Sequence, residues 1–141
     1  MARHPVIVDT NVVVAGLLTA NDTSPVALVL DGVLTARFSF VVSQALLGEY
    51  HAVLLRPKLH KLHRLTADEV DTFLTDLAQH AIVLNAAPEI GQRAPDPGDQ
   101  FLWDLLAARA DLQLITGDTV LLKDVNMRGR VISPRQFLNA A

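Results

Sequence analysis

Short apolar runs rich in valine, isoleucine and leucine alternate along the chain with longer segments whose apolar residues recur at helical spacing. An apolar run of about four to eight residues between turn residues predicts a buried β-strand, whereas apolar residues three and four apart predict an amphipathic helix. We predict strands at residues 5–8, 37–42, 81–84, 112–115 and 131–132.

Residues that favour helix termini stand between these strands. Ser24 followed by Pro25 provides a capping hydroxyl and a proline at the first helical position, and Gly32 is expected to end that helix. Residues 66–69, Thr-Ala-Asp-Glu, have the pattern of a capping box. We predict helices at residues 11–18, 24–30, 43–55, 66–77 and 96–108, and a last helix that begins at residue 133.

The alternation of strands and helices predicts an α/β fold with a central, mainly parallel, five-stranded sheet flanked by helices on both faces. A chain of 141 residues has the length of one ordinary domain, so we expect residues 1–141 to form a single domain. Ligand sites in such folds lie at the carboxyl ends of the strands, near the point where the strand order reverses. Reactive side chains at those ends are therefore the first candidates for a functional site.

Four acidic residues fall at that end of the predicted sheet. Asp9 follows the first strand directly, and Asp118 comes shortly after the fourth strand. Glu49 and Asp99 lie early in helices on the same side, each at the edge of an apolar stripe. Taken one by one, each acid also has an ordinary explanation as a helix cap, a turn residue or a surface carboxylate. Their joint placement favours a shared carboxylate site.

A cluster of carboxylates needs a positive partner, because like charges in one place repel each other and raise some of the pKa values. Mg²⁺ and Mn²⁺ prefer oxygen ligands, and one or two such ions can activate a water molecule and orient a phosphodiester. Zinc is a poor candidate, because the chain has no cysteine and the four candidate ligands are all carboxylates.

Overall composition narrows the function further. The lack of cysteine excludes disulfides and thiol catalysis and fits a reducing cytoplasm, where we expect the protein to be located. No apolar run reaches the roughly 18 residues of a membrane span, so no membrane partner is expected. The formal net charge of −3 argues against a generally basic nucleic-acid binder, although residues 56–64 form a local basic run.

Five segments in this order resemble the motifs of PIN-domain nucleases, and the nearest branch is that of the bacterial toxin components of toxin–antitoxin systems, akin to VapC toxins. The first begins Asp-Thr-Asn after an apolar strand, the third reads Asp-Pro-Gly-Asp, and the fourth ends Thr-Gly-Asp. From the first to the last, they span nearly the whole chain. The segments are residues 9–16, 43–59, 96–102, 114–118 and 131–138.

The resemblance implies a three-layer PIN fold, Mg²⁺- or Mn²⁺-dependent cleavage of single-stranded RNA, a homodimer, and an antitoxin whose tail blocks the active site. Val120 stands where this branch often has a further acid, so the number of metal ions, one or two, stays open. Asp96 is either a further metal-site acid or a helix cap. The implied catalytic and metal-binding residues are Asp9, Glu49, Asp99 and Asp118, supported by the polar residues Asn11, Ser43 and Thr116.

Basic residues are candidates for weak contacts to RNA phosphates, although the run at 56–64 also reads as a solvated segment between helices. His60 and His63 have the spacing of a helical metal pair, but no third ligand is evident. The candidate RNA-binding residues are Arg56, Lys58, Lys61, Arg64, Arg128 and Arg130.

Other functions remain alternatives. A haloacid-dehalogenase-like phosphatase also places an aspartate after its first strand, but it needs a second aspartate where this chain has Asn11. A catalytically inactive PIN-fold protein could bind RNA or a partner through a degenerate metal site. A PIN nuclease that cuts DNA would use the same chemistry, so only a comparison of substrates separates it from a ribonuclease.

Overall fold

The computed structural model of the chain describes residues 4–85, 93–127 and 129–139. Its strands are all parallel and run in the order β3-β2-β1-β4-β5, with β2 joined to β1 by a single bridge between Phe40 and Val6. This confirms the predicted α/β fold with a parallel sheet. The strands are β1 (Val6–Val8), β2 (Val41–Val42), β3 (Ile82–Val83), β4 (Gln113–Ile115) and β5 (Val131–Ile132).

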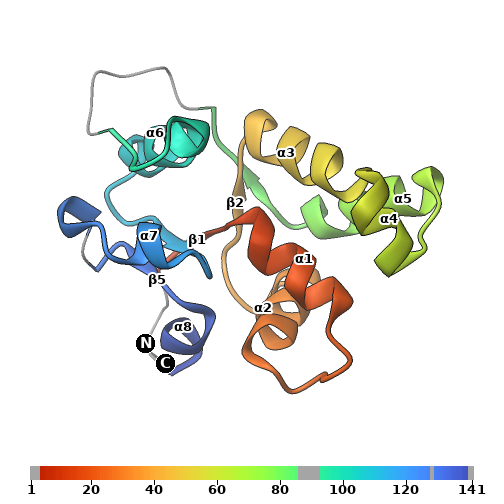
Figure 1. Ribbon diagram of the computed structural model, residues 1–141. Helices are drawn as coiled ribbons and strands as arrows, with labels where there is room; N and C mark the ends of the chain where they lie inside the picture. Colours follow the sequence, from red (N-terminus) through yellow and green to blue (C-terminus); the bar gives the residue numbers. More distant parts are fainter. Residues whose placement is uncertain (1–3, 86–92, 128, 140–141) are drawn as a thin grey trace.

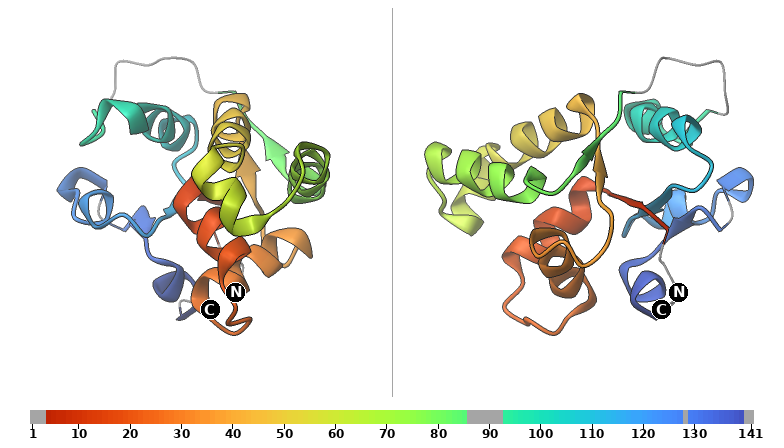
Figure 2. Two further views of the ribbon diagram at one scale, coloured as in Figure 1. Left: turned by 45° about the vertical axis from the view of Figure 1, so that its right-hand side comes forward. Right: turned by 180° about the vertical axis from the view of Figure 1, so that it is seen from behind.

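Helices connect the strands and surround the sheet (Figures 1 and 2). Hydroxyl caps begin three of them as predicted: Ser24 and Ser43 each accept a hydrogen bond from a backbone nitrogen, and Thr66 forms both bonds of a capping box with Glu69. The helices are α1 (Thr10–Leu18), α2 (Pro25–Leu34), α3 (Gln44–Leu54), α4 (Pro57–His63), α5 (Ala67–Ala78), α6 (Gln100–Ala108), α7 (Thr119–Leu122) and α8 (Pro134–Asn139), with 3-10 turns η1 (Pro97–Asp99) and η2 (Val125–Met127).

Strand β1 lies at the centre of the strand order. The chain leaves β1 toward β2 and β3 on one side and later crosses to β4 and β5 on the other. The strand order therefore reverses between β1 and β4, which opens a crevice at the carboxyl ends of these two strands. Asp9 follows β1 and Thr116 follows β4 at that position.

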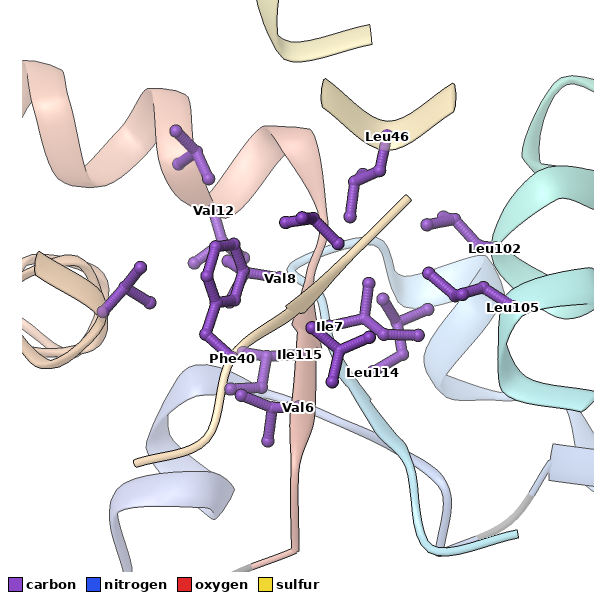
Figure 3. Close-up of a cluster of buried hydrophobic side chains, with 14 of the residues drawn as sticks. Val6, Ile7, Val8, Val12, Phe40, Leu46, Leu102, Leu105, Leu114 and Ile115 are labelled. Carbon is purple, nitrogen blue, oxygen red and sulfur yellow. The ribbon is translucent and has the colours of Figure 1, made fainter. Parts of the chain in front are cut away.

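The core packs against both faces of the sheet, because successive side chains of a strand point to opposite sides. Figure 3 shows Leu102 and Leu105 of α6 approaching Ile7 and Leu114 on one side. On the other side, Val12 of α1 lies near Val8 and Phe40 (Figure 3). All of these side chains are at most 2% exposed. Opposing layers of helices therefore hold the ends of β1 and β4 in place.

The structure corrects several predicted boundaries. Residues 56–64, expected as a segment between helices, contain α4, which begins at Pro57 and ends where Arg64 adopts a left-handed conformation. The strand predicted at 37–42 is shorter, and its regular part is only β2. Short α7 after Asp118 was not predicted. The segment from Asp96 begins with η1, so α6 starts only at residue 100.

Gly32 was expected to end α2, but the helix continues to Leu34. A Cβ atom on Gly32 would lie 2.3 Å from Cε2 of Phe38, so the glycine makes room for this aromatic ring. The ring in turn packs edge-on against Phe137 of α8, with ring centroids 4.8 Å apart. Gly32 is therefore a packing residue here and not a helix terminator. In the described part of the chain, no helix is long and apolar enough to cross a membrane.

Candidate active site

Asp9 stands where β1 turns into α1, and both its backbone and its side chain are held. Its backbone nitrogen donates to the carbonyl of Ile115 in β4 at 2.9 Å. The Oδ1 atom caps α1 by accepting a hydrogen bond from the backbone nitrogen of Thr10 at 2.8 Å. Only 7% of the residue is exposed. Asp9 is thus a buried carboxylate at the carboxyl end of the central strand.

The second carboxylate oxygen of Asp9 is tied to the turn after β4. Thr116 donates from Oγ1 to Asp9 Oδ2 at 2.8 Å, and Asn11 donates from Nδ2 to the same oxygen at 3.3 Å. Asn11 also accepts, through Oδ1, from the backbone nitrogen of Gly117 at 3.1 Å. Thr116 Oγ1 accepts from the backbone nitrogen of Asp118 at 3.0 Å. These bonds fix the two strand ends relative to each other.

Asp118 and Asp99 lie on the two elements that follow and precede β4. Asp118 caps α7 by accepting from the backbone nitrogen of Val120 at 2.9 Å. Asp99 is half-buried at the start of α6. Asp96 is exposed, and its Oδ1 accepts from the backbone nitrogen of Gly98 at 2.8 Å. The contact of Asp96 is therefore that of a cap for η1.

Glu49 reaches the same region from α3. The next residue, Tyr50, is fully buried, and its hydroxyl donates to the backbone carbonyl of Val8, directly before Asp9. This bond sets the position of α3 against the end of β1 and leaves half-buried Glu49 facing the crevice. Ser43 serves α3 as its cap, with Oγ accepting from the backbone nitrogen of Leu46 at 3.1 Å.

A cleft of about 510 Å³ joins the four predicted acids. Asp96, Ser43 and Thr116 are not part of its lining, although Thr116 lies directly beneath Asp9 through its hydrogen bond. The lining also includes an apolar group that the sequence did not single out. The full lining is Asp9, Thr10, Asn11, Val14, Ala15, Leu18, Glu49, Val53, Leu59, Asp99 and Asp118.

Burial is the main cause that raises the pKa of Asp9. Hydrogen bonds from Thr116 and Thr10 oppose this shift, whereas the negative charges of Glu49 and Asp118 add to it. The protein therefore orients this carboxylate firmly but gives its charge little compensation. A cation beside Asp9 would supply the missing positive charge.

The other acids experience the same mutual repulsion. Burial and then the charge of Asp99 raise the pKa of Glu49, and the nearby Arg56 partly counters them. Burial also raises the pKa of Asp99, and the charges of three neighbouring acids, first among them Asp9, raise it further. An acidic cleft of this kind attracts cations and repels a phosphate group unless a cation lies between them.

The donor set fits a hard divalent cation in its chemistry, because every charged side chain in the cleft lining presents carboxylate oxygens. Among the described residues, however, no group of three or more histidine, aspartate or glutamate side chains is arranged to hold a metal ion. The acids thus share one cleft without forming a closed set of ligands.

The predicted basic residues divide into two groups. Arg56, Lys58, Lys61 and Arg64 are exposed on α4 or at its ends, and α4 also contributes Leu59 to the cleft. Arg130 instead donates to the carbonyl oxygens at positions 106, 109 and 112, so this guanidinium is engaged within the protein. Arg128 lies outside the described residues.

His63 has a structural contact that explains its place in the sequence. Its Nε2 lies 2.8 Å from the carbonyl oxygen of Leu54, and its Nδ1 accepts from the backbone nitrogen of Leu65 at 2.9 Å. The Nε2 contact docks the end of α4 onto the end of α3, whereas the Nδ1 contact holds the turn after α4, so neither nitrogen is left free for a metal. Trp103 is buried in the core and 1% exposed, as a packing residue would be.

A comparison with protein families matches the PIN domain over residues 5–120. The matched region contains β1 to β4 and all four acids that line the cleft. A search of curated proteins finds no match to the chain. The PIN domain is a nuclease fold, and it spans most of this sequence. The chain therefore belongs to the PIN domain family.

Proposed function

We propose that the protein is a metal-dependent endoribonuclease that hydrolyses phosphodiester bonds of single-stranded RNA. The observation that carries the proposal is one cleft lined by carboxylates from the end of β1, from α3, from the start of α6 and from the turn after β4. Membership of the PIN domain family supports a nuclease, and the family generally depends on divalent metal ions.

Asp9, Glu49, Asp99 and Asp118 would hold one or two Mg²⁺ or Mn²⁺ ions. Such an ion, when bound, polarises a phosphodiester and lowers the pKa of a coordinated water molecule. The remaining tasks belong to the protein. Asn11 and Thr116 hold Asp9 Oδ2 in one orientation, so this carboxylate does not have to be ordered during the reaction.

Residues of α4 are proposed to hold the RNA backbone. Arg56, Lys58, Lys61 and Arg64 are exposed near the cleft, where their positive charge would offset the repulsion between the acidic cleft and the phosphates. Phosphate contacts of this kind position a nucleic acid without reading its sequence. Cleavage specificity would then come from the cleft itself.

The resemblance to VapC toxins supports a cellular role as the toxin of a type II toxin–antitoxin pair. In this proposal the protein acts in the cytoplasm as a homodimer, and a cognate antitoxin inhibits it by covering the cleft. An acidic cleft is suited to such inhibition, because a basic side chain of a partner could occupy the position of the cation.

A phosphatase mechanism is disfavoured by the position of Asn11. A haloacid-dehalogenase-like enzyme needs a general acid at this residue, but both ends of the Asn11 amide are committed to Asp9 and Gly117. An amide also has no proton to donate in the relevant pH range. The nuclease proposal makes use of the bonds that Asn11 forms.

The test is cleavage of a labelled single-stranded RNA with Mn²⁺, compared with DNA of the same sequence. Asp9→Asn should abolish cleavage, whereas Asp31→Asn, which alters an exposed carboxylate on α2, should not change it. EDTA should stop the reaction and Mn²⁺ should restore it. Equal cleavage by both variants would indicate a contaminant, and RNA binding without any cleavage would support the inactive PIN-fold alternative.

A further inference from the structure

The cleft has two chemically different halves. One half carries the acids, and the other is formed by hydrocarbon side chains of α1, α3 and α4. The ribbons of these three helices lie close together in Figures 1 and 2. Helices α1, α3 and α4 contact one another in the described structure. The apolar half consists of Val14, Ala15 and Leu18 of α1, Val53 of α3 and Leu59 of α4.

Of these five apolar residues, Val14 packs against the hydrophobic core, whereas Ala15, Leu18, Val53 and Leu59 are not among the residues that do. On α1, Val12 and Val13 are buried in the core at 1% exposure, whereas Val14 and Leu18 remain half-buried beside the cleft. A hard divalent cation is bound through oxygen atoms, so these hydrocarbon side chains contribute none of its ligands. A cation held by the acidic half would bind an anionic group, and the apolar half would contact a flat apolar group. The two halves together therefore indicate a ligand that carries both groups side by side.

A nucleotide has this combination, with its phosphate one sugar away from a base. The cleft volume of about 510 Å³ lies within the range of roughly 300–1,000 Å³ that is typical of small-ligand sites. A base can reach such a wall only after it leaves its stack, because a paired and stacked base is covered on both faces.

We propose that the apolar half is a subsite for the unstacked base of the nucleotide next to the scissile phosphate. This inference rests on the proposed nuclease function and adds how that site selects its substrate. Side chains of valine, alanine and leucine offer no hydrogen-bond groups, so the subsite would read the presence and size of a base and not its pattern of donors and acceptors. Paired RNA would be excluded because its bases cannot enter.

Leu59 is the residue best suited to a test. It is half-buried on α4, and α4 is docked onto α3 through Nε2 of His63, so the wall has a fixed position. Leu62 lies on the same helix and is 61% exposed, outside the cleft lining. The substitutions Leu59→Ala and Leu62→Ala therefore remove the same atoms from the same helix, but only the first alters the cleft.

The experiment measures binding of a short labelled single-stranded RNA by fluorescence anisotropy with Ca²⁺, and cleavage of the same RNA with Mn²⁺. A set of RNAs, each lacking the base at one position, is measured in parallel. We expect that one abasic position weakens binding to the unaltered protein about fivefold to tenfold, because the apolar contact area between the base and the subsite is lost. Leu59→Ala should weaken binding of intact RNA similarly but leave that abasic RNA unaffected, and Leu62→Ala should change neither.

This non-additivity is what a direct contact between Leu59 and the base requires, since removal of either partner removes the same interaction. If no abasic position matters, or if Leu59→Ala weakens all RNAs equally, the subsite does not hold a base. Unchanged binding in Leu59→Ala would overturn the inference as well and would leave the apolar half for a side chain of a protein partner.

The two proposals fail differently. Cleavage of intact and abasic RNAs at equal rates would contradict the base subsite while it supports the nuclease. Non-additive binding without any cleavage would support the subsite and contradict the nuclease proposal.

Discussion

Asn11 Oδ1 accepts a hydrogen bond from the backbone nitrogen of Gly117, 106 positions further along the chain, and so connects α1 to the turn after β4. The same side chain donates through Nδ2 to Asp9, which orients a carboxylate of the cleft. The amide of Asn11 thus holds α1 against the turn after β4 and also orients Asp9, the most buried acid of the cleft.

Asn11→Ala should lower the cleavage rate about 10- to 100-fold, the usual cost of losing a side chain that orients a metal ligand. The measurement is the rate with saturating Mn²⁺, together with thermal unfolding to show that the fold persists. Asn85→Ala, which removes an exposed amide after β3, is the matched control. An unchanged rate in Asn11→Ala would show that Asp9 needs no such support.

Tyr50→Phe should destabilise the protein, because the hydroxyl is the partner of a buried carbonyl at Val8. We expect a loss of about 1–3 kcal/mol in the free energy of unfolding, measured by urea denaturation. The same variant should also cut RNA more slowly, since α3 and Glu49 lose their fixed distance from the end of β1. Equal stability would mean that the hydroxyl bond makes no net contribution.

Alkaline pH provides a second test of Tyr50, the one tyrosine in the sequence. Burial, followed by the charges of Asp9 and Glu49, raises the pKa of its phenol well above the ordinary value. The resulting stabilisation is complete below the unfolded pKa of about 10 and is lost as the pH rises toward the folded pKa. Ultraviolet titration should therefore detect phenolate only as the protein unfolds.

The acids of the cleft predict how stability depends on pH and on cations. Burial and mutual repulsion raise the pKa of Asp9, Glu49 and Asp99 in the folded protein. Their protonated forms favour folding, so this contribution is complete below the unfolded values of about 4 and is lost as the pH rises through the folded values.

In EDTA, ionisation of Asp9, Glu49 and Asp99 should therefore lower the melting temperature as the pH rises above about 4. Mn²⁺ should restore the melting temperature most at neutral pH, where these acids are ionised. The double variant Glu49→Gln with Asp99→Asn should show a smaller Mn²⁺ effect and a weaker dependence on pH. A melting temperature that Mn²⁺ leaves unchanged at neutral pH would contradict a cation site in this cleft.

Charges on α4 should determine how RNA binding responds to salt. Lys58→Gln with Lys61→Gln should weaken binding and lower the log–log salt slope by about 1.4, or about 0.7 for each phosphate contact to a single strand. Arg37→Gln with Arg135→Gln removes two exposed charges outside the cleft lining and serves as the matched control. Equal salt slopes in the two double variants would exclude α4 as the RNA-binding helix.

Much of this architecture follows from local sequence patterns. A continuous apolar run such as residues 6–8 can bury both of its faces only as a strand between two layers of helices. A cap such as Thr66 acts within one helical turn, so neighbouring residues suffice to predict it. The placement of Asp9 and Asp118 at strand ends followed from the same patterns. The structure brings both into one cleft with Glu49 and Asp99, as expected from the parallel order.

Other features depend on partners distant in sequence and could not be predicted. Helix α4 buries none of its residues, so it lacks the apolar stripe that predicts a helix. Gly32 has the local character of a helix terminator, yet its role is set by the ring of Phe38. The hydroxyl of Tyr50 acts on a strand 42 positions earlier, and only its place beside Glu49 in the sequence pointed to the site.

The central position of β1 has a consequence for the newly made chain. Asp9 gains its partner Thr116, and β1 gains a neighbour on its second side, only when β4 inserts next to it. A nascent chain that ends before β4 carries Asp9, Glu49 and Asp99 but lacks Asp118 and Thr116, which donates to Asp9 Oδ2. Because Asp9 and Thr116 are 107 positions apart, the contact that completes the cleft cannot form before residues 113–118 have been synthesised. The proposed nuclease activity would therefore be absent from a nascent chain until that segment has left the ribosome.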